Sequence, residues 1–319
     1  MGKGIADKRI FFLINPKAGG GLAEKCWERE LPLLEGNIDF FYEYTEGPDS
    51  IGEQICRAVN ERGAKAVVIV GGDGSLYDAV NGIITEDSLF SPDLVLGVCP
   101  LGSGCDFARY IYGGKHIPLI DLIMNGQVKR IDVACCEHAD QDGSRQRHYF
   151  INSFDMGAGA DTCVSVNAGD GRIKRLTHNG KLAFLLSALK VLLSFDYTET
   201  EIEADGQVYS GEYIIAGAGN GRFIGGGMLM FPRAALDDGM LDLLLVERRS
   251  KLKLCQAFPL IYSGSHLKLN GITYAKAVDV HIRTKRPIHI ELDGEVPGYT
   301  DVSLSVLPGI LPLLLPGSD

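Results

Sequence analysis

Three glycine-rich segments, each directly after a short apolar run, constrain this chain most. They read Asn-Pro-Lys-Ala-Gly-Gly-Gly at 15–21, Gly-Gly-Asp-Gly-Ser at 71–75 and Pro-Leu-Gly-Ser-Gly-Cys-Asp at 100–106. The apolar runs before them alternate with segments of helical periodicity. Strands that alternate with helices form parallel βαβ units, and such sheets bind ligands beyond the carboxyl ends of their strands. The sequence therefore predicts a parallel sheet with three glycine-rich loops at one edge.

The periodicity divides the chain into two parts. Before about residue 131 it predicts strands at 9–14, 39–44, 66–70 and 94–99, and helices at 22–35, 49–61 (with Asp49 or Ser50 as the N-cap) and 75–84. After that point polar and apolar residues alternate around the turn dipeptide Asp205-Gly206, which predicts a β-hairpin. Further strands are predicted at 241–247, 278–283, 287–292 and 302–307, and helices at 181–195 and 251–261.

The predicted fold class is therefore α/β plus β. Residues 1–132 form a nucleotide-binding α/β domain with a parallel sheet, and residues 133–306 form a β-rich antiparallel domain that takes the substrate. Residues 307–319 are expected to pack back on the first domain. A length of 319 residues fits two domains, because single cores stop growing at about 250–300 residues.

Composition excludes several functions. The net charge of −10 argues against nucleic acid as a partner, since nucleic-acid binders are usually basic. Eight cysteines without a Cys-x-x-Cys pair favour reduced thiols over a disulfide framework or a zinc site. The N-terminus has no signal-peptide pattern, and the apolar stretch 182–195 is too short to span a bilayer. A cytoplasmic protein is the prediction.

The three loops predict a cradle for nucleotide phosphates. Glycines let backbone N–H groups turn toward an anion ahead of a helix. Asp73 can reach a phosphate-bound Mg²⁺ or a reacting hydroxyl, Ser75 can cap its helix or donate to phosphate, and Asp106 is expected to cap the next helix. The P-loop, the dinucleotide fingerprint and the protein-kinase motifs are all absent from the sequence.

The second half carries four more motifs: Gly-Asn-Gly at 219–221, Gly-Gly-Gly at 225–227, Asp-Asp-Gly-x-Leu-Asp at 237–242 and Asp-Gly-Glu at 293–295. Together with the three loops, in this order, they resemble the diacylglycerol kinase catalytic domain family, which includes bacterial lipid kinases and sphingosine and ceramide kinases. The resemblance runs from about residue 9 to about residue 308. It implies an N-terminal sheet like that of NAD kinase and phosphofructokinase, a C-terminal β-sandwich, and ATP between them.

The resemblance also implies the site. A structural Mg²⁺ is implied at Asp238, with backbone oxygens near Ala235 and Met240. Glu295 is the implied proton acceptor, with Asp293 beside it, and Asp73 is expected to act through the metal or the nucleotide. The implied ATP contacts are Asn15, Pro16, Lys17, Ala18, Gly19, Thr45, Gly72, Asp73, Gly74, Ser75, Leu76, Tyr77, Asp78 and Ser103. The implied reaction is ATP- and Mg²⁺-dependent transfer of the γ-phosphate to a lipid hydroxyl, on diacylglycerol or a related lipid.

Three residues depart from the family pattern: Ser75 replaces a threonine, Asp78 a glutamate and Cys105 an asparagine. Two alternatives stay open. One is a kinase of a soluble substrate, like NAD kinase or phosphofructokinase, because the Gly-Gly-Asp-Gly-Ser loop does not separate these kinases from lipid kinases. The other, raised by Asp78 and Cys105, is a nucleotide-binding protein with a degenerate site. Asp293-Gly294 and the Asp-Asp-Gly at 237–239 are also ordinary turn sequences.

A basic segment suggests where a lipid substrate is met. Arg172, Lys174 and Arg175 precede the apolar stretch 182–195, which predicts docking on an anionic membrane surface that holds the lipid. The alternative is a core helix with a solvated basic start. The basic run at 248–253 is interpreted as an exposed turn that opens the next helix. A homodimer is an open alternative to a monomer.

Overall fold

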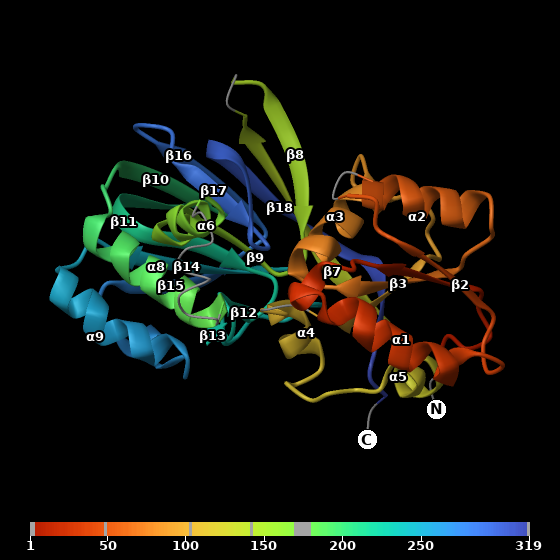
Figure 1. Ribbon diagram of the computed structural model, residues 1–319. Helices are drawn as coiled ribbons and strands as arrows, with labels where there is room; N and C mark the ends of the chain where they lie inside the picture. Colours follow the sequence, from red (N-terminus) through yellow and green to blue (C-terminus); the bar gives the residue numbers. More distant parts are fainter. Residues whose placement is uncertain (1–3, 48–49, 102–103, 141–142, 169–179, 318–319) are drawn as a thin grey trace. The chain divides into compact units, whose positions relative to one another are not determined.

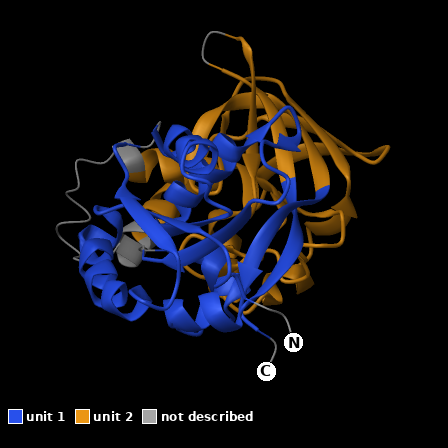
Figure 2. Ribbon diagram, turned by 90° about the vertical axis from the view of Figure 1, so that its right-hand side faces the viewer, with its two compact units in different colours: residues 1–133, 308–319 blue, residues 134–307 orange. Residues whose placement is uncertain are grey.

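The computed structural model describes residues 4–47, 50–101, 104–140, 143–168 and 180–317. The chain forms two compact units (Figure 2): unit 1 contains Met1–Val133 and Pro308–Asp319, and unit 2 contains Ala134–Leu307. The boundary predicted from the sequence lies one residue earlier. The C-terminal segment belongs to unit 1 because its strand joins the sheet of that unit.

Unit 1 is built on a parallel sheet. Its strands, in spatial order, are β6 (Val95–Pro100), β3 (Ala66–Gly71), β1 (Ile10–Ile14) and β2 (Phe40–Tyr44), and every neighbouring pair runs parallel. Leu313, near the end of the long strand β18 (Glu295–Leu315), pairs in parallel with Leu96. Every residue of β1 and β3 is buried, as expected for strands covered on both faces.

Helices cover this sheet on both faces (Figure 1), with α2 and α3 on one face and α1 and α5 on the other. The elements are η1 (Ala18–Gly20), α1 (Leu22–Leu34), α2 (Ile51–Asn60), α3 (Asp73–Ile83), the hairpin β4 (Ile84–Thr85) and β5 (Ser88–Leu89), α4 (Asp106–Ile111) and α5 (Leu119–Asn125). Ser50 is the N-cap residue of α2, but its hydroxyl donates to the Gly47 carbonyl and makes no capping hydrogen bond to the helix, and Asp49 lies outside the described residues. Helices α2 and α3 cross closely where Gly52 meets Gly82. A Cβ at Gly82 would lie 2.2 Å from the Cα of Gly52, so a side chain there would not allow this approach.

Unit 2 is rich in antiparallel strands. They are β7 (Gln127–Ala139, which begins in unit 1), β8 (Arg145–Phe150), β9 (Ser153–Gly157), β10 (Glu199–Ala204), β11 (Gln207–Gly219), β12 (Phe223–Ile224), β13 (Met228–Leu229), β14 (Leu241–Glu247), β15 (Ile272–Ala277), β16 (Asp279–Thr284), β17 (His289–Leu292) and most of β18. Its helices are α6 (Ala158–Ala168), α8 (Gly180–Ser194), α9 (Lys251–Ile261) and the short η3 (Ser265–Lys268). The predicted hairpin is confirmed: β10 and β11 are joined by Asp205 and Gly206, with φ of 47° and 82°.

Several longer elements were not predicted from the sequence: β7, β8, β9, α5, α6 and β15. The strands among them lack alternation of buried and exposed residues, because β9 is buried throughout, β7 and β8 each have one exposed and one buried part, and β15 is half-buried along most of its length. In the described part of the chain, no helix has both the length and the apolar character needed to cross a membrane.

Candidate active site

Asn15 ties the first glycine-rich loop to the second. It follows β1, and its backbone N–H donates to the Val70 carbonyl at 2.9 Å. Its side-chain amide donates to the Ser75 hydroxyl, also at 2.9 Å, and its side-chain oxygen accepts the N–H of Lys17 at 3.1 Å. Ser75 was expected to cap α3 or to donate to phosphate, but it lies buried in the first turn of α3 and accepts from Asn15. Two of the three loops are therefore fixed to each other by side chains.

Asp73 ties the second loop to the third. It is the first residue of α3, and its Oδ2 accepts the backbone N–H of Asp106 at 3.0 Å. The prediction that Asp106 caps α4 is therefore wrong, because the acceptor comes from a residue 33 positions earlier in the chain. The carboxylate of Asp106 instead pairs with Arg109 at 3.7 Å. Gly104 lies close beside this contact, since a Cβ there would be 3.3 Å from Oδ2 of Asp73.

The environment of Asp73 changes its acidity. The pKa of Asp73 is raised from 3.8 to about 6: burial raises it most, the carboxylate of Asp106 adds to the rise, and backbone N–H donors oppose it. A carboxyl group with a shifted pKa at the mouth of a parallel sheet is a candidate functional group.

The other predicted nucleotide contacts lie around these two ties. Pro16 and Lys17 lead into η1, which holds Ala18 and a Gly19 with a left-handed φ of 61°. Thr45 follows β2, and its N–H donates to the Ile14 carbonyl at 2.8 Å, which places it at the same sheet edge. Gly72, Gly74 and the half-buried Asp78 lie at the start of α3, whereas the side chains of Leu76 and Tyr77 are buried in the core. Ser103 lies outside the described residues.

Asp293 lies in the turn that joins β17 to β18. Asp293 and Gly294 have φ of 51° and 97°, and Leu292 pairs with Glu295, so the predicted hairpin turn is present. The Asp293 side chain is only 7% exposed. Its two carboxylate oxygens accept the backbone N–H groups of residues 151, 152 and 153 at 2.8–2.9 Å. These bonds make Asp293 a residue that positions the start of β9 against the turn.

Glu295, the next residue but one, has a different environment. It is exposed. Partial desolvation raises the pKa of Glu295 above its ordinary value. A carboxylate with a raised pKa at the tip of a rigid hairpin is suited to accept a proton.

A pair of buried carboxyl groups under this turn was not predicted from the sequence. Asp155 on β9 and Glu291 on β17 are opposite each other in the sheet and are 3% and 6% exposed. Burial and the neighbouring carboxyl groups raise the pKa of both residues well above the ordinary range. The sequence offered one signal for this pair, a charged residue (Asp155) in the middle of the segment Ser-Phe-Asp-Met-Gly. No local rule predicts that Glu291 is its neighbour across the sheet.

The carboxyl pair also holds the local structure. Glu291 accepts the backbone N–H of Gly294, so the Asp-Gly-Glu turn is bonded from two sides. Asp155 Oδ2 lies 1.4 Å from where a Cβ of residue 159 would be, so α6 can approach β9 only with Gly159 at this position. Among the described residues, neither oxygen of Asp155 has a well-oriented hydrogen-bond donor.

The Asp-Asp-Gly segment forms the turn before β14, as its sequence also allowed. Asp238 accepts the N–H of Met240 at 3.2 Å and is ion-paired with Lys276. The Lys276 ammonium also lies 3.5 Å from the fully buried carboxylate of Asp242. Within the described ranges, no three His, Cys, Asp or Glu side chains are grouped to hold a metal. A metal at this segment would therefore rest on Asp238 and on backbone oxygens such as those of Ala235 and Met240.

Comparisons with known proteins agree with this arrangement. Residues 9–136 match the diacylglycerol kinase catalytic domain, and residues 155–315 match the domain described as the YegS C-terminal NAD kinase beta sandwich-like domain. The chain belongs to the diacylglycerol kinase catalytic domain family. Membership makes it an enzyme of the lipid-kinase class, in which ATP is the phosphate donor.

Relatives of this family member span nearly its whole length. It is 27% identical to a diacylglycerol kinase of Bacillus subtilis, over 91% of both chains, and 28% identical to one of Mycobacterium tuberculosis, over 97% of this chain and 95% of the other. The Bacillus subtilis protein YtlR is 30% identical over 94% of this chain and 97% of its own. The crystal structure of a diacylglycerol kinase from Bacillus anthracis has the same fold, with a TM-score of 0.73 over 97% of both chains at 23% identity.

Proposed function

We propose that this lipid kinase transfers the γ-phosphate of ATP, with Mg²⁺, to a hydroxyl of diacylglycerol or a closely related lipid. The observation that carries the proposal is the pair of side-chain ties at the edge of the unit 1 sheet. Two hydrogen bonds hold the three glycine-rich loops together: one from the Asn15 side chain to Ser75, and one from the Asp106 N–H to the Asp73 carboxylate. Such a rigid group of backbone N–H donors suits a polyphosphate, and phosphoryl transfer depends mainly on positioning and on neutralising charge.

The carboxyl groups fit a divalent cation by their chemistry. Carboxylate oxygens are the ligands that Mg²⁺ prefers, and the raised pKa of Asp73 means that its charge is poorly compensated without a cation. Mg²⁺, when bound, supplies neutralisation of the phosphate charge. Asp73 would serve this ion or the nucleotide, whereas Asp238 with the backbone oxygens of Ala235 and Met240 would hold a separate structural ion.

Glu295 is the proposed proton acceptor. A lipid hydroxyl is a weak nucleophile until a base takes its proton, and the raised pKa of Glu295 brings this carboxylate nearer to the working pH. Asp293 and Glu291 would act through it. Glu291 accepts the Gly294 N–H within the turn, and Asp293 accepts backbone N–H groups at the start of β9, so both fix the hairpin that carries Glu295.

The variant Glu295→Gln tests this role. General-base catalysis is worth roughly 10²–10⁴ in rate, so phosphate transfer from labelled ATP to diacylglycerol should fall by that order. Nucleotide affinity, measured by calorimetry, should change little. Glu203→Gln, at an exposed position of β10 in the same unit, is the matched control. Normal turnover of the Glu295 variant would mean that Asp-Gly-Glu is only a hairpin here.

A substrate screen tests the reaction itself. Turnover with ATP is measured against diacylglycerol, monoacylglycerol, phosphatidylglycerol, sphingosine and NAD. Transfer to diacylglycerol or monoacylglycerol supports the proposal. Transfer to NAD alone would replace it with a kinase of a soluble substrate, and nucleotide binding without any transfer would point to a degenerate site.

A further inference from the structure

Helix α8 exposes a ridge of leucines. Leu186, Leu189 and Leu193, which share one helix face, are 47%, 38% and 40% exposed. The opposite face is used internally, because Ser187 and Ala188 are buried and Val191 and Leu192 pack against the core of unit 2. The alternative of a core helix therefore describes only one side of α8. Its other apolar face is exposed in the described part of the chain.

The start of helix α9 adds basic charge and another exposed leucine. Lys251 and Lys253 are exposed, and Leu252 between them is 70% exposed, whereas Leu254 is buried in the unit 2 core. In a chain of net charge −10, neither 180–195 nor 248–264 contains an acidic residue. Lys190 is exposed on the leucine face of α8.

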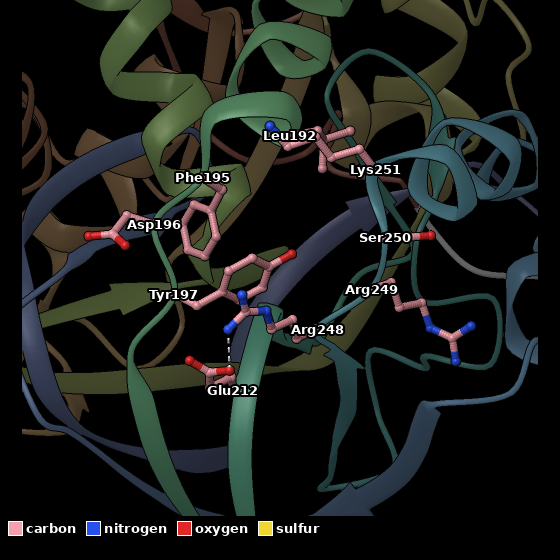
Figure 3. Close-up of a pocket in the computed structure, with 9 residues that line it drawn as sticks. All are labelled: Leu192, Phe195, Asp196, Tyr197, Glu212, Arg248, Arg249, Ser250 and Lys251. Carbon is pink, nitrogen blue, oxygen red and sulfur yellow. Dashed lines mark hydrogen bonds and ion pairs between the residues drawn. The ribbon is translucent and has the colours of Figure 1, made fainter.

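The two helices lie side by side in unit 2 (Figure 1). Leu192 and Phe195 from the end of α8 line the same cavity, of about 580 Å³, as Ser250 and Lys251 from the start of α9 (Figure 3). We call the surface formed by Leu186, Leu189, Lys190, Leu193, Lys251, Leu252 and Lys253 the α8–α9 face. Apolar and basic side chains thus meet on one surface of a single unit.

The cavity behind this face is lined by both signs of charge, because Asp196 and Glu212 line it together with Arg248 and Arg249. Arg248 stacks on the Tyr197 ring at 4.8 Å and bonds to Glu212 at 2.7 Å, and Arg249 lines the same space (Figure 3). The basic run at 248–253 was interpreted only as an exposed turn. The structure shows that it also borders the exposed leucines.

We propose that the α8–α9 face docks on an anionic phospholipid surface, with its leucines entering the bilayer interface and its lysines against the lipid phosphates. Leucines on one side of a helix with lysines beside them are the pattern of interfacial helices. Charge complementarity favours a lipid surface of negative charge, because the face is locally basic although the whole chain is acidic, and distant acidic groups are screened within about 10 Å. The inference rests on the proposed lipid substrate, since a kinase of a bilayer lipid must reach the interface.

Vesicle sedimentation tests this face. The full chain should sediment with phosphatidylcholine vesicles that contain phosphatidylglycerol, and much less with phosphatidylcholine alone or at high salt. Each basic residue near an anionic surface is worth about fivefold in partitioning, so Lys251→Glu with Lys253→Glu should weaken binding by about 25-fold or more. Leu193→Gln with Leu252→Gln should also weaken it by more than tenfold, because the inserted apolar groups are lost.

Two matched controls change comparable residues elsewhere. Arg283→Glu with Lys285→Glu reverses two exposed cations on or just after β16, and Leu22→Gln with Leu33→Gln alters two exposed leucines on α1. Both should leave sedimentation unchanged. Failure of the wild-type chain to bind anionic vesicles would overturn the proposal, as would equal binding by the α8–α9 variants and the controls.

A second measurement reports insertion without depending on activity. The chain has one tryptophan, Trp27, which is buried in unit 1. A tryptophan placed by Leu252→Trp should shift its emission to the blue when anionic vesicles are added, and the same change at Leu22 should not. Turnover of a water-soluble short-chain diacylglycerol separates the two proposals, because it does not require docking. If the wild-type chain does not phosphorylate this substrate, the lipid kinase function is refuted. The vesicle result still decides whether the α8–α9 face docks on a membrane.

Discussion

Replacing Asp73 by asparagine should make unit 1 more stable at neutral pH while it removes most kinase activity. The fold raises the pKa of Asp73 to about 6 from 3.8, so it favours the protonated carboxyl group. Stability from this group is therefore fully present below about pH 3.8 and is lost as the pH rises through about 6. At neutral pH the charged form costs about 3 kcal/mol relative to a neutral group. Asparagine keeps an oxygen that can accept the Asp106 N–H, but it carries no charge.

The assay is urea denaturation followed by the emission of Trp27, the single tryptophan, which packs against Phe12 of β1 and so reports on unit 1. Between about pH 4.5 and 7.5 the variant should gain about 2 kcal/mol relative to the wild type, a shift of about 1 M in the urea midpoint. Phosphate transfer should fall on the order of 10²–10³, as for the loss of one electrostatic element of an active site.

Asp93→Asn, an exposed carboxylate of the same unit, is the control and should show neither effect. A midpoint difference between Asp73→Asn and wild type that is the same at both pH values would refute the argument from burial. Turnover within a few-fold of wild type would refute the functional assignment.

Three further predictions follow from single contacts and from the sequence. Asp293→Asn replaces one of the two oxygens that accept three backbone N–H groups and should lower unit 2 stability by about 1–3 kcal/mol, seen as a lower melting temperature by circular dichroism; an unchanged melting temperature would contradict it. Cys105→Asn should stabilise unit 1 by about 0.5–1 kcal/mol, because Cys105 has a φ of 51°, which asparagine tolerates better, and a lower urea midpoint would count against this reasoning. Changing Arg172, Lys174 and Arg175 together to glutamate should release the protein from anionic vesicles, and unchanged sedimentation would show that these residues take no part in docking.

The local sequence determined where elements begin and where the chain turns. The glycine-rich loops after β1, β3 and β6 were predictable because a strand followed by a helix needs a tight turn, and glycine supplies it. The hairpin at Asp205-Gly206 was predictable for the same reason. The parallel pairing of unit 1 was predictable from the alternation of strands and helices, because two strands joined by a helix lie parallel in the same sheet.

The tertiary structure decided which side chain meets which backbone group. Asp73, rather than Asp106, accepts the first N–H of α4, and Asp293 holds N–H groups 140 positions earlier in the chain. Asp155 and Glu291 face each other only because β9 and β17 are neighbours in the sheet. Likewise, the sequence showed that the stretch 182–195, which covers most of α8, is apolar, but only the structure showed that Val191 and Leu192 pack into the core while the leucine ridge is exposed. Helix and turn signals act over a few residues, whereas these contacts join residues that are distant in sequence, and no local rule specifies such partners.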